Sequence, residues 1–108
     1  MEGIRQPILT YIHNRYGKAS PTHDAVIELR IAYKNKQKYL STGIRLYPRE
    51  WQRGRVVYRL DAAILNKTLD KLMVDVRQVI YDMIDDGNID IFAIPVKLAA
   101  KRRKAMKL

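Results

Sequence analysis

The chain has 108 residues, of which 47 % are hydrophobic and 30 % are charged; this length and composition fit one small globular domain and exclude wholesale disorder. It contains no cysteine and no apolar run near the roughly 20 residues of a bilayer-spanning helix, which excludes disulfides, thiolate metal sites and a transmembrane segment. The formal net charge of +10 favours a polyanionic partner.

The first elements are predicted from residue types and turn signals. Residues 1–6 are expected to be a disordered start, and residues 7–13 a short strand because they are rich in β-branched and aromatic side chains. Residues 14–24 predict a loop, since they show no apolar periodicity and contain Gly17 and Pro21.

A β-hairpin is the clearest local prediction. Residues 25–33 and 39–46 both alternate between apolar and polar side chains, so one face of the hairpin is apolar and the other is polar and basic. A two-residue turn at Asn35-Lys36 would set the register: the apolar face pairs Ile31 with Leu40, Leu29 with Thr42 and Ile27 with Ile44, and the polar face pairs Ala32 with Tyr39, Arg30 with Ser41, Glu28 with Gly43 and Val26 with Arg45. Because Asn-Lys is a weaker turn signal than Asn-Gly, a slipped register or a longer loop is the alternative.

The segment after the hairpin leaves the sheet at Pro48, because proline interrupts strand pairing. A turn at residues 52–54 then leads into a short strand at residues 55–59, and we expect Trp51 to fill part of the core.

A long amphipathic helix is predicted from about residue 61 to residue 86. Asp61 is expected to cap its start and Gly87 to end it in a left-handed conformation. Apolar residues recur along it at spacings of three and four, namely Leu65, Leu69, Leu72, Val76, Val79, Ile80 and Met83. The fold class that follows is α+β, a small antiparallel sheet of three or four strands packed on one C-terminal helix.

Residues 91–108 are expected to lie outside the folded unit of residues 7–90, as a basic tail or a linker into a further domain. Residues 96–108 fit either a short basic helix or a mobile tail, because they lack a comparable apolar stripe. A linker or a contact to a nucleic-acid backbone is favoured over a membrane anchor, because the apolar side chains of this stretch are small.

Charge is sorted into blocks along the chain. Residues 24–59 have a net charge of +6, residues 60–90 of −4 and residues 91–108 of +6. The sheet face of the first block is the candidate DNA-binding surface, and its residues are Arg30, Lys34, Lys36, Lys38, Tyr39, Ser41 and Arg45. A β-ribbon fits the major groove, where arginine can bind guanine bidentately and lysines at a turn can neutralise phosphates. The alternative is an ordinary solvated sheet face.

Catalytic chemistry has little support in the residues. Two histidines without any cysteine cannot fill a zinc site, and the helix aspartates are expected to be spread around an exposed face rather than paired for acid–base work. We expect no enzyme activity, no metal, no cofactor and no small-molecule substrate.

Five stretches of the chain carry a family resemblance: Ile27-Glu-Leu-Arg-Ile31, Lys38-Tyr-Leu-Ser-Thr-Gly-Ile44, Pro48-Arg-Glu-Trp51, Arg55-Val56 and Leu65-Asn66. Together they resemble the N-terminal arm DNA-binding domain of phage-integrase-type tyrosine recombinases, in the version found in integrases of conjugative transposons. Such domains are a β-sheet plus a C-terminal helix, and the sheet enters the major groove of arm-type sites. The resemblance covers residues 7–86.

The resemblance implies roles for named residues. Arg30, Tyr39, Ser41 and Arg45 would read the DNA, with Lys34, Lys36 and Lys38 at the hairpin tip. A full recombinase also has core-binding and catalytic domains, which 108 residues cannot hold. We therefore expect an excised arm domain or a truncated product that does not cut DNA but tethers a recombinase to arm-type sites during DNA integration or excision.

The expected partners are double-stranded DNA and, by the resemblance, other recombinase subunits or excision factors, but no membrane. Residues 1–16 lack a secretory signal, so a cytoplasmic, nucleoid-associated bacterial protein is expected. Two alternatives stay open: an RNA-binding or ribosome-associated module using the same basic face, and a protein-interaction domain whose acidic helix docks a basic partner.

Overall fold

The computed structural model describes residues 6–106, with side chains to residue 104, so the expected disordered start lies outside the described residues except for Gln6. The elements in chain order are β1 (Ile8–His13), β2 (Ala25–Tyr33), β3 (Lys36–Leu46), a 3-10 turn (Pro48–Glu50), β4 (Trp51–Gln52), β5 (Arg55–Val56), α1 (Ala62–Asp85), a second 3-10 turn (Ile91–Ala93) and α2 (Ile94–Met106). The expected α+β fold is confirmed, with a second helix and a separate pair of very short strands added to it.

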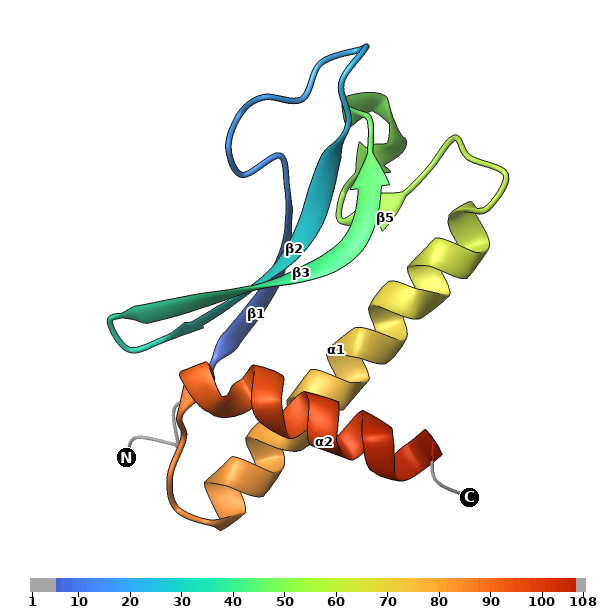
Figure 1. Ribbon diagram of the computed structural model, residues 1–108. Coiled ribbons are helices and arrows are strands. Elements are labelled where there is room, and N and C mark those ends of the chain that lie inside the picture. The colour runs from blue at the N-terminus through green and yellow to red at the C-terminus, as the bar shows by residue number, and fades with distance from the viewer. Residues whose placement is uncertain (1–5, 107–108) are drawn as a thin grey trace.

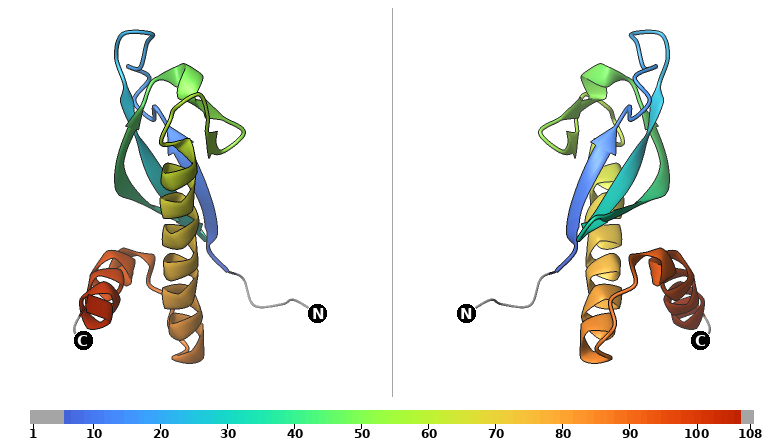
Figure 2. Two further views of the ribbon diagram at one scale, coloured as in Figure 1. Left: turned by 90° about the vertical axis from the view of Figure 1, so that its right-hand side faces the viewer. Right: turned by 90° about the vertical axis from the view of Figure 1, so that its left-hand side faces the viewer.

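The main sheet has three antiparallel strands in the order β1-β2-β3, and α1 covers one of its faces (Figures 1 and 2). The covered face carries Ile27, Leu29 and Ile31 of the central strand, each with no exposed surface, because alternate residues of a strand point to the same side. Tyr11 of β1 also ties the sheet to α1, since its hydroxyl donates to the Leu69 carbonyl at 2.6 Å. Burial raises the pKa of Tyr11 to about 12.

The hairpin register differs from the expected one over its distal half. The turn is Lys34-Asn35, with Lys34 in the left-handed region at φ 54°, so that Tyr33 pairs with Lys36 and Leu29 with Leu40. The slipped alternative is therefore the observed one. Because the slip is by two residues, every side chain keeps the face that the alternation predicted.

A bulge restores the expected register at the other end of the hairpin, where Val26 pairs with Arg45. Residues 42–44 stand opposite Ile27, and Gly43 takes a φ of 76°, which glycine adopts without a Cβ penalty. The Thr42 hydroxyl donates to the Ile27 carbonyl at 2.8 Å and so pins the bulge to the central strand.

Helix α1 packs as its periodicity predicts, with Leu65 half-buried and the rest of the predicted stripe buried. Its C-terminal end is also confirmed: Gly87 has φ 78°, and the Asn88 N–H donates back to the Met83 carbonyl at 3.0 Å. At the other end, Asp61 takes the expected N-cap position, but its side chain does not cap the helix. The Asp61 carboxylate makes no bond to the helix N–H groups and instead accepts from the Arg59 guanidinium at 2.8 and 3.0 Å.

The chain beyond residue 90 is part of the packed core. Ile91, Ile94 and Leu98 are buried with the α1 stripe and the sheet, and α2 lies across α1 (Figure 1). Of the two alternatives for residues 96–108, the structure has the helix, through Met106. Pro95 stands in the first turn of α2, where its missing N–H is not needed, so it begins a helix rather than breaking one.

A smaller cluster of Ile27, Leu46, Val56 and Leu69 closes the opposite end of the sheet, and Trp51 packs against it half-buried. The strand expected over residues 55–59 is limited to Arg55–Val56, which pairs with β4. None of the described helices is both long and apolar enough to cross a membrane.

Candidate nucleic-acid interface

The face of the sheet opposite α1, here called the outer face, has no helix packed against it (Figure 2). Pairing across the strands puts Thr10, Arg30 and Tyr39 in one row, and Ile12, Glu28 and Ser41 in the next. Val26 and Arg45 pair near the bulge. A polar surface three strands wide is thus held in place by the buried face beneath it.

Four of the seven predicted site residues lie on the outer face, namely Arg30, Tyr39, Ser41 and Arg45. Lys34 is exposed in the turn. The structure does not bring Lys36 and Lys38 onto the outer face, because they pair with Tyr33 and Ile31 on the side of α1. Lys36 there lines a hollow with the segment 88–92, and Lys34 lines the same hollow.

An arginine that sequence reasoning left in a loop is central to the outer face. Arg15 follows β1 and forms a bidentate ion pair with Glu28, with both N–O distances at 2.9 Å. Its guanidinium also stacks on the Tyr39 ring at 3.9 Å from the centroid and on Tyr16 at 4.4 Å. One signal in the sequence could have indicated such an arginine. Glu28 is the acid on the polar face of the predicted hairpin, and a carboxylate that becomes buried there needs a cation as its partner.

The Arg15–Glu28 pair explains how a carboxylate can sit with 7 % exposure in the middle of this face. Hydrogen bonds from Arg15 lower the pKa of Glu28, against the opposing effect of burial. The same bonds raise the pKa of Arg15, so both groups stay ionised near neutral pH. The pair fixes the loop to the sheet and holds Tyr39 in a defined position.

The other arginines of the outer face differ in how firmly they are held. Arg45 bonds the Asp24 carboxylate at 2.8 Å and approaches the Asp24 carbonyl at 3.4 Å. Arg30 makes only one long bond, 3.3 Å, to the neutral Gln37 side chain, and no acid pairs with it among residues 6–104. Arg30 is therefore the strand arginine of the outer face that has no acidic partner among residues 6–104.

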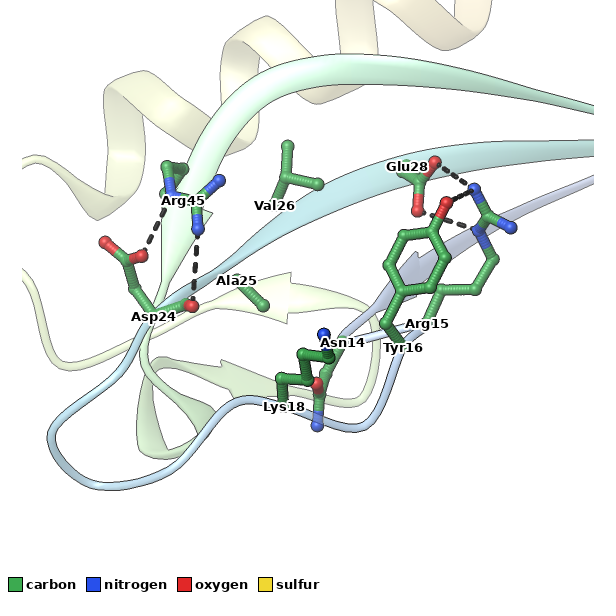
Figure 3. Close-up of a pocket in the computed structure, with 9 residues that line it drawn as sticks. All are labelled: Asn14, Arg15, Tyr16, Lys18, Asp24, Ala25, Val26, Glu28 and Arg45. Carbon is green, nitrogen blue, oxygen red and sulfur yellow. Dashed lines mark hydrogen bonds and ion pairs between the residues drawn. The ribbon is translucent and has the colours of Figure 1, made fainter.

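A hollow of about 430 Å³ opens on the outer face between the loop 14–24 and the hairpin (Figure 3). Ala25 and Val26 form an apolar part of its lining, and Arg15, Lys18 and Arg45 stand around it. Such a site suits a ligand that has both an apolar edge and negative charge, as a nucleotide has. No group of three or more His, Cys, Asp or Glu side chains that could hold a metal ion occurs in the described part of the chain.

Comparisons of the chain with protein-family models, with curated proteins and with solved structures find no match. The geometry and charge of the outer face are therefore the basis on which a function can be assigned.

Proposed function

We propose that the chain binds duplex DNA by placing the outer face of its sheet in the major groove. Following the resemblance described above, this binding would tether a tyrosine recombinase to arm-type sites during DNA integration or excision. The single observation that carries the DNA proposal is a sheet face without a helix against it, on which Arg30 of the central strand has no acidic partner among the described residues. The nearby acids Asp24 and Glu28 are already paired.

The dimensions support this mode of binding. Strands lie about 4.8 Å apart, so the axes of the two outer strands are about 10 Å apart, and the major groove of B-DNA is about 12 Å wide. Alternation directs Arg30, Ser41 and Arg45 to the same side, where arginine can bind guanine bidentately. Lys34, exposed in the turn, would contact a phosphate beside the groove.

Selection from a random duplex library, followed by fluorescence anisotropy on the selected site, tests the proposal. Arg30→Ala should weaken binding to that site by roughly ten- to a hundredfold, as loss of one bidentate base contact predicts, and should affect unrelated duplexes much less. Lys67→Ala is the matched control, since it removes one positive charge from an exposed position of α1.

Two results would contradict the proposal. One is a wild-type protein that binds structured RNA as tightly as the selected duplex at the same salt concentration, because the narrow major groove of A-form RNA does not admit a sheet. The other is an equal, sequence-independent loss for Arg30→Ala and Lys67→Ala.

A further inference from the structure

Helix α2 holds a set of cations at fixed positions in the fold. Ile94 and Leu98 anchor it in the core, and Arg102 reaches the buried Asp75 of α1 at 3.5 Å. Asp75 is paired with Lys71 as well, at 2.9 Å. The basic side chains of α2 therefore move with the sheet and α1 as one unit.

Helix α2 lies close to the edge of the sheet that β3 forms. It crosses α1 on the side on which β3 lies (Figure 2). A cleft of about 300 Å³ is lined by Ser41 and Thr42 of β3 together with Leu98 and Arg102 of α2. Since β3 is an edge strand, Arg102 adjoins the open edge of the sheet that carries the proposed DNA-binding face.

The charge on α2 is unbalanced. Residues 91–104 contain no acid, and none of the ion pairs among the described side chains involves Lys97, Lys101, Arg103 or Lys104. Arg103 is exposed and lies next to Arg102 in the chain. Arg102 approaches Asp75 through Nη2, and a guanidinium has five N–H donors, so donors remain for a second acceptor.

We propose that α2 is a second contact to the same duplex, in which Arg102 and Arg103 bind phosphates of the DNA strand that borders the β3 side of the groove. This inference rests on the proposed function. The backbones that border a major groove are about 12 Å apart, so a sheet seated in the groove has a phosphate ridge beside each edge strand. Arg102 stands next to one of these edges, where it would position the protein without reading bases.

The salt dependence of binding tests this contact. Arg102→Ala/Arg103→Ala should lower the slope of log affinity against log salt by about 1.8, because each phosphate contact contributes about 0.9. The affinity deficit relative to wild type should accordingly shrink about tenfold between 50 and 200 mM salt. Ethylation interference should lose its signal at phosphates on one flank of the site only.

Lys67→Ala/Arg77→Ala is the matched control, because it removes two charges from exposed positions of α1 and should leave the flanking phosphate signal intact. Arg102→Lys/Arg103→Lys should keep most of the slope. Thermal unfolding of each variant separates a folding defect from a lost contact.

Each outcome bears on a different claim. Suppose that wild-type protein binds the duplex and that Arg30→Ala impairs binding. If Arg102→Ala/Arg103→Ala and Lys67→Ala/Arg77→Ala then change the slope and the footprint equally, the α2 contact is refuted and the sheet contact stands. If wild-type protein shows no preference for duplex DNA, the proposed function fails together with the inference.

Discussion

At the scale of single residues, Arg45 is a proposed DNA-binding residue whose guanidinium already forms an ion pair with Asp24. Asp24→Asn should free the Arg45 guanidinium and raise the affinity for duplex DNA about two- to fivefold at low salt, the worth of one exposed ion pair. Asp86→Asn removes the same charge at the exposed C-terminal end of α1 and should have a smaller effect. Anisotropy titrations of both variants, with and without Arg45→Ala, measure the coupling. A gain from Asp24→Asn that persists without Arg45 would contradict this role.

A second residue-scale prediction concerns the pH dependence of folding. Arg15 lowers the pKa of Glu28, whose ordinary value is about 4.3, so the carboxylate stabilises the folded state above that pH and loses its contribution as the pH falls through the lowered pKa. Glu28→Gln should lower the melting temperature at pH 7 by roughly 5 °C. Thermal melts followed by circular dichroism from pH 8 to pH 3 should show that the difference in melting temperature between Glu28→Gln and wild type becomes smaller below about pH 4. A gap that does not change with pH would show that the ion pair adds nothing to stability.

At the scale of elements, α2 is expected to unfold together with the sheet and α1. Ile94 is fully buried, so Ile94→Ala should lower the free energy of unfolding by about 3 kcal/mol. Val96 in the same turn is 71 % exposed, and Val96→Ala should change the free energy of unfolding by less than about 0.5 kcal/mol. Chemical denaturation followed by circular dichroism gives both values. A separate early loss of helix signal in Ile94→Ala, with the main midpoint unchanged, would mean that α2 is not part of the cooperative unit.

The same element shows why a boundary near residue 90 was expected. The apolar contacts of α2 come from Ile94 and Leu98 in its first turns, preceded by Ile91 in the 3-10 turn, and the basic remainder of the helix has no stripe of its own. Buried residues that are divided between two short elements show no helical periodicity, because a periodic pattern needs several turns of one helix. The sequence therefore did not predict that this segment packs in the core.

At the scale of the whole molecule, the acidic block along α1 is less uniform than its sequence suggests. Asp61, Asp70 and Asp75 are each paired with an arginine or lysine, and Asp75 is buried rather than on an exposed face. The other acids of this block, Asp82, Asp85, Asp86 and Asp90, are all exposed and gather at the C-terminal end of α1. Cations lie close to two of these acids, because Lys34 and Lys36 line a hollow with Asp90, and Lys97, Lys101 and Lys104 line another with Asp82.

Local pattern in the sequence determined the faces of the hairpin, the buried stripe of α1, the left-handed end at Gly87 and therefore the α+β class, because each depends on residues a few positions apart. Tertiary structure alone decided the docking of α2 and the placement of Arg15 over Tyr39. These features depend on contacts between segments far apart in the chain, whose free energies no local periodicity records. Four of the seven candidate site residues lie on the outer face because side chains alternate along a strand. Arg15 lies there through its ion pair with Glu28, a contact between a loop and the central strand that no alternation predicts.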